Sequence, residues 1–242
     1  MYLSKYISVI IPAYNEESLI FDTLNSVPDY IDKIIIINDG STDSTKEKIE
    51  NFIDERLIFV NHKKNMGVGY AIISGYEESL KNDIDITIVM DGDGQMDPKY
   101  IPDLIEPIIR DDYDYVKGNR LVNKNYRHGM SKWRQFGNII LSFLTKISSG
   151  YWHINDPQNA FTAISNKTLK KIDFQSLYPR YGYPNHLLSI LNVNNCKVIN
   201  VPIPSKYGNE KSKIVYHKYI YSVSILLIRC FVFRINNKYL RF

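Results

Sequence analysis

Two carboxylates stand one residue apart in ITIVMDGDGQMDP, residues 86–98. Asp91 and Asp93 follow a β-branched, apolar run, and residues i and i+2 of an extended chain point to the same side. Two carboxylates so placed repel each other unless a cation lies between them. Oxygen ligands suit Mg²⁺ or Mn²⁺, and Mg²⁺ often combines one or two carboxylates with substrate phosphates. The stretch therefore predicts a metal-bridged diphosphate, with a plain Asp-Gly turn as the alternative.

The elements that must position these acids alternate along the chain. Apolar runs predict buried strands at 7–11, 33–38, 57–62, 86–90 and 113–116. Helical patterns separate the first four at 16–27 and 67–80, and residues 39–53 open with turn residues and then become an amphipathic helix capped by Asp43 or Ser44. This alternation predicts a parallel sheet covered on both faces, so the first ~110 residues should form a doubly wound α/β unit.

Three polar loops, PAYNEE, NDGSTD and DGDGQMD, fall where the predicted strands end. Ligands of doubly wound sheets bind beyond the carboxyl ends of the strands, so the three loops predict one site. A dinucleotide site would place GxGxxG directly after the first strand, where Pro-Ala-Tyr-Asn stands, and the chain has no GxxxxGK[ST]. Dinucleotide and P-loop sites are therefore excluded.

Charge is distributed unevenly over the 242 residues. The net charge is +4, but residues 205–242 carry +7, and residues 117–134 hold six basic residues and no acidic one. Both stretches are candidates for contact with anions. Two cysteines without a CxxC predict a reducing compartment and inert thiols, and the apolar run before Pro12 is too short for a signal peptide. We expect a catalytic domain over 1–213 and a basic amphipathic tail over 214–242.

A family resemblance is carried by six stretches in order: VIIPAYNEE (9–17), INDGSTDST (37–45), NMGVGYAIISGY (65–76), VMDGDGQMDP (89–98), GNR (118–120) and DPQNAF (156–161). With these the chain resembles family 2 glycosyltransferases of the GT-A fold. DGQMDP and DPQ point to the branch of dolichyl- or polyprenyl-phosphate sugar synthases. The resemblance implies a nucleotide-sugar donor, a UDP- or GDP-hexose, with Mg²⁺ or Mn²⁺ on its diphosphate, and no nucleic-acid partner.

The resemblance also assigns individual positions. Those implied to bind the nucleotide sugar are Pro12, Ala13, Tyr14, Glu16, Asp39, Gly67, Asp91 and Gly92. Those implied to hold the metal are Asp91, Asp93 and Gln95. Asn38 stands where many relatives have an Asp, which leaves the base open. The alternative for Tyr14 is an aromatic side chain packed in the core. The alternative for Glu16 is an acid that stabilises a helix N-terminus through the helix dipole.

The acceptor is suggested by a missing acid. A sugar hydroxyl needs a general base, whereas a phosphate monoester is already ionised near neutral pH. Relatives that build polysaccharides carry a carboxylate base after the DxD half, but here no Asp or Glu occurs between Asp173 and Glu210. His186 is the remaining titratable candidate there, and a structural role is expected for it. The gap favours an acceptor that is itself a phosphate.

The basic stretch 117–134 follows the fifth predicted strand and so starts at the active edge. By resemblance, Arg120, Arg134 and Lys213 are assigned to the acceptor phosphate, and Asp156 to orienting the acceptor or a positive group. An Asp-Pro turn is the alternative for Asp156. The implied catalytic set is Asp91, Asp93, Asp156, Arg120 and Arg134. The other basic residues of the stretch are expected to be surface charges: Lys117, Lys124, Arg127 and Lys132.

Two apolar stretches could meet a membrane. Residues 219–235 mix aliphatic and aromatic residues with Arg229 and Arg234, a composition typical of a helix in an anionic lipid interface. Residues 136–152 are a second candidate, and core or dimer helices are the alternative for both. No 18-residue apolar span is free of charge, so no transmembrane helix is expected. We expect a cytoplasmic protein, peripheral at the inner face of the membrane, with a possible membrane-protein partner or homodimer.

Three functions stay open at this point. The favoured one is an inverting transferase that moves a hexose from a nucleotide sugar to polyprenyl phosphate. The second adds a sugar to a hydroxyl of a surface polysaccharide or glycolipid. The third is a non-catalytic GT-A module that binds nucleotide sugar.

Overall fold

The computed structural model describes residues 1–122, 126, 132–204 and 216–240, with backbone alone for 132–134 and 216–218. The strands are β1 (Ile7–Ala13), β2 (Lys33–Asn38), β3 (Leu57–Asn61), β4 (Ile86–Val89), β5 (Tyr115–Asn119), β6 (Thr162–Ser165) and β7 (Val198–Pro202). The α-helices are α1 (Ile20–Asn25), α2 (Thr45–Glu50), α3 (Val68–Lys81), α4 (Ile101–Asp111), α5 (Lys132–Ser149), α6 (Asn166–Leu169), α7 (Tyr183–Val193) and α8 (Tyr216–Ile235). The short helical turns are η1 (Pro98–Tyr100), η3 (Phe174–Ser176) and η4 (Asn236–Leu240).

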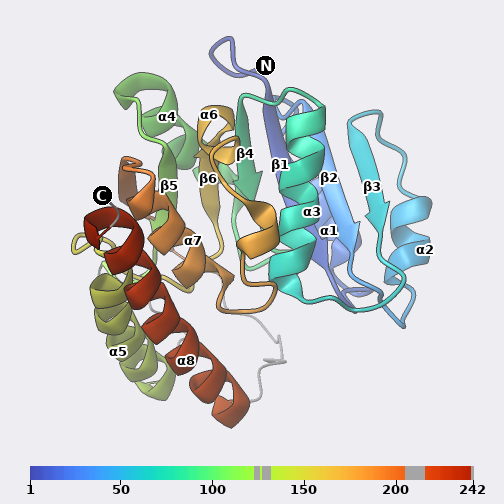
Figure 1. Ribbon diagram of the computed structural model, residues 1–242. Coiled ribbons are helices and arrows are strands. Elements are labelled where there is room, and N and C mark those ends of the chain that lie inside the picture. The colour runs from blue at the N-terminus through green and yellow to red at the C-terminus, as the bar shows by residue number, and fades with distance from the viewer. Residues whose placement is uncertain (123–125, 127–131, 205–215, 241–242) are drawn as a thin grey trace.

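The strands form one mostly parallel sheet in the order β3-β2-β1-β4-β6-β5-β7 (Figure 1). β6 runs antiparallel to both of its neighbours, β4 and β5, and the other neighbouring pairs are parallel. The carboxyl ends of β1, β2, β4 and β5 therefore share one edge with the amino end of β6. This edge, called the site edge below, holds the loops that the sequence predicts to bind ligand. The predicted α/β class and mostly parallel sheet are confirmed.

Helices cover both faces of the sheet because side chains alternate along each strand. Val9 and Ile11 of β1 pack with α1, α2 and α4, whereas Ile10 packs on the other face with α3, α6 and α7. All four isoleucines of β2 are 0% exposed. Burying a large apolar side chain stabilises the folded state by roughly 1.5–3 kcal/mol relative to leaving it in water. The apolar strand runs of the sequence thus become two cores, one on each face.

The fifth strand lies further along the chain than the sequence predicts. β5 spans Tyr115–Asn119 instead of 113–116, because pairing with β7 and a Gly118 N–Phe161 O bond of 2.9 Å carry the extended backbone onward. Lys117 is consequently inside the sheet and 0% exposed. The expectation that Lys117 is a surface charge is wrong.

The start of α1 differs from the sequence prediction, whereas α2 starts directly after Asp43 and Ser44, the two predicted cap positions. α1 begins at Ile20 instead of 16, after a turn in which Leu19 N donates to Glu16 O at 3.0 Å. α2 begins at Thr45, and Asp43 Oδ1 accepts from Thr45 N at 3.0 Å, while Ser44 makes no side-chain cap bond. Both helices are therefore shorter than their sequence patterns, although their positions are as predicted.

α8 is packed against α5 and α7, and α5 and α8 lie side by side at the end of the molecule away from β3 (Figure 1). Arg234 of α8 closes the carboxyl end of α5: its Nε donates to Ser148 O and its Nη2 to Ile147 O, each at 3.0 Å. A cation at this end also favours the helix dipole. Leu226 and Leu227 of α8 are each 6% exposed. The tail helix is thus joined to the rest of the fold.

The polarity of α5 is inverted relative to that of an ordinary surface helix. Its buried side carries the hydroxyls of Ser142, Thr145, Ser148 and Ser149. Its outer side carries apolar residues at helical spacing, each 40–56% exposed and together called the α5 apolar stripe below: Phe136, Ile139, Ile140, Phe143 and Leu144. Large exposed apolar patches mark contact with a partner or a membrane.

α8 exposes a second stripe, called the α8 apolar stripe: Ile220, Tyr221, Ile228, Phe231 and Val232. Within the described residues, Tyr219–Leu240 is the one segment long and apolar enough to cross a membrane by length and composition, and an 18-residue window of it has a mean hydropathy of 1.4 and is 28% buried. Arg229 and Arg234 interrupt this segment, so it is not free of charge, and its place in or on a membrane stays a prediction.

Candidate active site

The loops after β1 and β2 form one continuous surface at the site edge. Asn15, at φ 54°, donates its N–H to Ser41 Oγ at 3.0 Å and accepts from Thr42 N at 2.9 Å through Oδ1. Glu16 N donates to Thr45 Oγ1 at 2.8 Å. Two of the three predicted loops are therefore held in a fixed relation before any ligand arrives.

The loop after β4 packs against the end of β1 at Gly92. A Cβ on Gly92 would lie 3.2 Å from Pro12 O, and Gly92 O accepts from Thr23 Oγ1 at 3.1 Å. Pro12 and Ala13 are buried at the end of β1, whereas Tyr14 is 36% exposed. All three predicted loops therefore meet at the end of β1, where Tyr14 is partly exposed.

Asp91 and Asp93 lie at the start of the third loop. Asp91 N donates to Met96 Sδ at 3.2 Å, and Asp93 Oδ1 accepts from Gln95 N at 3.0 Å. Burial, followed by repulsion from Asp93, raises the pKa of Asp91 to about 7, with Arg120 opposing the shift. Among the described residues, Arg120 and Lys117 only partly offset the repulsion at Asp91, and a divalent cation would relieve it.

The chain offers few protein ligands for that cation. Within its described part no group of three or more His, Cys, Asp and Glu is placed to hold a metal. Asp91 and Asp93, with Gln95 two residues on, would leave several coordination positions to other oxygens. Mg²⁺ binds in this manner when a substrate diphosphate completes its shell. The donor set therefore fits a metal that arrives with its substrate.

Arg120 and Asp156 form a buried, two-pronged ion pair. Arg120 Nε donates to Asp156 Oδ2 at 2.6 Å, Nη2 donates to Oδ1 at 2.7 Å, and the backbone N donates to Oδ2 at 3.0 Å. Asp156 is 0% exposed and has a φ of 50°. Burial alone would raise its pKa, but the charge and hydrogen bonds of Arg120 outweigh burial and the pKa is lowered. Asp156 thus fixes the guanidinium at the site edge.

Asp39 holds the turn before α3. Its Oδ1 accepts from His62 Nδ1 at 2.8 Å and from Met66 N at 2.9 Å, and its Oδ2 accepts from Gly67 N at 2.8 Å. His62 Nε2 lies 3.0 Å from Ser74 Oγ. Burial would raise the pKa of Asp39, but these hydrogen bonds lower it overall. Asp39 is only 2% exposed and lies beneath the loop that carries Gly67.

Gly67 and Gly69 let a second segment, residues 178–182, dock on the start of α3. Gly67 has a φ of 101°, and a Cβ there would lie 2.7 Å from Pro179 O. A Cβ on Gly69 would lie 2.6 Å from Tyr178 O, and Tyr70 N donates to Pro179 O at 3.0 Å. Both positions need glycine because backbone approaches backbone there.

The docked segment brings Tyr181 to the site edge. Tyr181 is 45% exposed, and its pKa is raised by burial and then by the charges of Asp91 and Glu16. His186 Nδ1 accepts from Tyr178 N at 3.2 Å, and burial lowers the His186 pKa. His186 therefore holds the segment from below, in the structural role expected from the sequence.

Some predicted positions lie outside the described residues. These are the side chains of Lys132 and Arg134 and the whole of Lys124, Arg127 and Lys213. The site edge brings together five of the described predicted residues: Asp91, Asp93, Glu16, Arg120 and Asp156.

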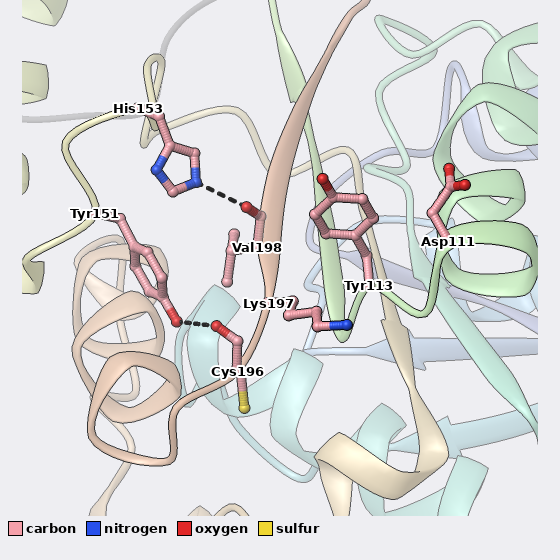
Figure 2. Close-up of a pocket in the computed structure, with 7 residues that line it drawn as sticks. All are labelled: Asp111, Tyr113, Tyr151, His153, Cys196, Lys197 and Val198. Carbon is pink, nitrogen blue, oxygen red and sulfur yellow. Dashed lines mark hydrogen bonds between the residues drawn. The ribbon is translucent and has the colours of Figure 1, made fainter.

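A cavity of about 430 Å³ lies at the amino end of β7, away from the site edge (Figure 2). Its polar groups are largely paired within the chain: Tyr151 Oη donates to Cys196 O at 2.6 Å, and His153 Nε2 lies 2.8 Å from Val198 O. None of the residues that line it belongs to the predicted site.

Comparisons with known proteins match the part of the chain that forms the site edge. The family model described as Glycosyl transferase family 2 matches residues 8–173, which include all three loops and the Arg120–Asp156 pair. A UDP-N-acetylglucosamine–dolichyl-phosphate N-acetylglucosaminyltransferase from Methanococcus voltae is 34% identical over 218 residues, covering 84% of this chain and 86% of that protein. A dolichol-phosphate mannosyltransferase from Pyrococcus furiosus is 28% identical, covering 81% and 55%.

Solved structures show the same fold. Glucosyl-3-phosphoglycerate synthase from Mycobacterium tuberculosis, crystallised with Mn²⁺, UDP and phosphoglyceric acid, matches with a TM-score of 0.68 at 19% identity, covering 96% of this chain and 78% of that one. The family model covers most of the sheet and every motif that carries the resemblance. The chain therefore belongs to glycosyl transferase family 2.

Proposed function

We propose that the protein is an inverting glycosyltransferase that moves a hexose from a nucleoside-diphosphate sugar to a polyprenyl phosphate at a membrane surface. The observation that carries the proposal is the composition of the site edge. Two carboxylates suited to a metal-bound diphosphate face a clamped arginine, and residues 174–209 contain no Asp or Glu to act as a base. Relatives named for transfer to dolichyl phosphate support it.

The donor half of the site would use the loops after β1, β2 and β4. Asp91, Asp93 and Gln95 would hold Mg²⁺ or Mn²⁺, which acts as a Lewis acid on the leaving diphosphate. Glu16 is close enough to Asp91 to raise its pKa, Tyr14 is assigned to the same donor, and Asp39 would act through the Gly67 turn that it holds. A structural neighbour crystallised with Mn²⁺ and UDP supports this assignment.

The acceptor half would use cations instead of a base. A phosphate oxygen of the lipid attacks C1 of the sugar, the C1–O bond to the nucleoside diphosphate breaks, and the configuration at C1 inverts. The attacking oxygen is already ionised, so no proton has to be removed. Arg120, Arg134 and Lys213 are assigned to the acceptor phosphate, because an arginine guanidinium matches phosphate oxygens in pairs.

Product analysis tests the proposal. Radiolabelled UDP- and GDP-sugars, selected by a thermal-shift screen with Mn²⁺ and Mg²⁺, are incubated with polyprenyl phosphate. Label that enters the organic phase and is released by mild acid is the expected result. Acid-stable label in a polysaccharide or glycolipid would favour the hydroxyl acceptor, and a thermal shift without turnover would favour a binding module.

Arg134→Ala should weaken use of the lipid phosphate more than binding of the donor. A charge-assisted hydrogen bond is worth roughly 1.5–3 kcal/mol, so the acceptor kcat/KM should fall about 10- to 150-fold. Lys132→Ala, two residues away and expected at the surface, is the matched control. Equal losses for donor and acceptor would place Arg134 on the donor side.

The α5 and α8 apolar stripes are the surface proposed to meet the membrane, at its inner face. Together they offer ten large exposed apolar side chains, and α8 adds Arg229. Apolar insertion contributes a salt-insensitive part of the binding, and exposed cations add about 1 kcal/mol each near anionic lipid. A homodimer or a membrane-protein partner would use the same stripes.

Phe143→Asp and Ile228→Asp, one in each stripe, should abolish co-sedimentation with anionic vesicles. Wild-type protein should bind neutral vesicles less well and be partly released by high salt, since salt screens only the charges. Ile53→Asp is the matched control, since Ile53 is 99% exposed far from both helices. Truncation near Tyr216 is a poorer test, because it also removes buried Leu226 and Leu227. Absence of binding by folded wild type would contradict a membrane-facing role.

A further inference from the structure

Lys117 is a fully buried lysine that neither half of the proposed reaction uses. It sits in the middle of β5, opposite Thr162 of β6 and Asn200 of β7, and is 0% exposed. Its Nζ donates to the main-chain carbonyl of Asn159. Burying an ammonium group is costly unless it is paired, so a lysine at this position requires an explanation.

The hydrogen bond joins β5 to the loop of residues 156–161. Gly118 N donates to Phe161 O at 2.9 Å, and a Cβ on Gly118 would lie 2.8 Å from Asn159 Nδ2. Arg120 then grips Asp156 at the start of the same loop. Lys117, Gly118 and Arg120 thus attach the loop at its middle, its end and its beginning.

The loop is itself a tight turn. Asn159 N donates to Asp156 O at 3.1 Å, and Phe161 N donates to Asn159 Oδ1 at 3.1 Å. A shift of the Asn159 carbonyl would therefore be transmitted to Asp156 through the turn. Since Asp156 fixes Nε and Nη2 of Arg120, the guanidinium depends on where Lys117 holds Asn159.

Charge gives a second reason for lysine at this position. Burial lowers the Lys117 pKa to about 7, while Asp156 and Asp91 attract its positive charge and Arg120 repels it. When it is protonated, Lys117 is a second cation beside Arg120 that attracts these two carboxylates. Lys117 and Arg120 both act on Asp91 and on Asp156, so loss of the Lys117 charge would change the electrostatic field around the Arg120 guanidinium.

We propose that Lys117 is a positioning residue of the transfer reaction, which holds the 156–161 loop so that Asp156 aims Arg120 at the reacting phosphates. The kinetic consequence rests on the proposed function; the structural consequence does not. A lysine that served only the core would stabilise the sheet without affecting the aim of Arg120.

The experiment compares Lys117→Met, Asp156→Asn, the double variant and wild type, with Thr162→Val as the matched control on the neighbouring strand. Hydrogen exchange should rise in residues 156–161 of Lys117→Met and stay unchanged in α3. The kcat of Lys117→Met should fall by at least about 10-fold, and its donor affinity should change less than about 3-fold. The reason is that the variant loses the orientation of Arg120 and not the binding of the donor. The double variant should be within about 2-fold of Asp156→Asn, since both act through Arg120.

Unchanged exchange at 156–161 in Lys117→Met would overturn the proposal whatever the acceptor proves to be. Losses in kcat that multiply in the double variant would overturn it as well. Lys117→Arg, which keeps a cation and donors, should retain more turnover than Lys117→Met. If neither variant folds, Lys117 is a core residue and the proposal fails. Wild type that labels no lipid phosphate would count against the proposed function, while the exchange result still decides on Lys117.

Discussion

Asp91→Asn and Asp93→Asn should each lower turnover by more than about 100-fold, because stabilising the leaving diphosphate through a metal is worth several kcal/mol. The fold should survive both changes. The pKa of Asp91 is about 7 in the folded chain, against an ordinary value of 3.8. Its ionised form therefore costs the folded state stability, a cost that grows as pH rises from 3.8 to about 7.

This linkage gives the metal prediction a readout besides turnover. In excess chelator above pH 7, Asp91→Asn should have a thermal midpoint equal to or above that of wild type. Added Mn²⁺ with the nucleoside diphosphate that the donor screen selects should raise the midpoint of wild type and leave the variant unchanged. Asp97→Asn is the matched control, since Asp97 lies in the same loop and accepts from Lys99 N at 3.2 Å. Near-normal turnover of either variant in chelator would rule out the metal-bridged diphosphate.

Arg120→Met should both inactivate the enzyme and destabilise it by about 3–5 kcal/mol, since it leaves the Asp156 carboxylate buried without its partner. Denaturant unfolding at neutral pH measures the loss. The Asp156 pKa is lowered in the folded chain, so the pair contributes stability above pH 3.8 and loses it as pH falls through the folded-state value. The difference between wild type and Arg120→Met should therefore shrink in acid.

A double variant separates stability from chemistry at this pair. Arg120→Met with Asp156→Met removes both charges, and replacing a buried pair by apolar groups is often neutral for stability. The double variant should regain stability relative to Arg120→Met and remain inactive. Lys46→Met is the control for an exposed pair: Lys46 and Glu50 are each about half exposed, and about 0.3–0.5 kcal/mol is expected. An Arg120→Met variant as stable as wild type would contradict the buried pair.

The sequence predicted those features that local pattern determines. β2 spans 33–38 as predicted, because a run of isoleucines can only be buried, and the polar loops meet because parallel strands end at one edge. The family prediction is confirmed. The residue roles stay predictions, because they concern contacts with ligands that sequence and fold only imply.

The features that sequence reasoning missed depend on pairing between distant segments. β5 ends at Asn119 because β7 and the 156–161 loop hold it, and nothing near Lys117 announces those partners. The one local signal was alternation, since Lys117 shares a face with buried Tyr115. The position of His62 at the site edge could be predicted from the sequence, because His62 directly follows β3. Its hydrogen bond to Asp39 could not.

The inverted polarity of α5 bears on how hydrodynamic measurements of this enzyme should be interpreted. A helix with hydroxyls inward and Phe136, Ile139 and Phe143 outward has a surface that water solvates poorly. In buffer without lipid or detergent, another copy of the chain is the nearest available cover for that surface. A dimer peak in such buffer would therefore show only that the apolar surface of α5 is covered. The number of chains in the active enzyme has to be measured in a micelle or nanodisc.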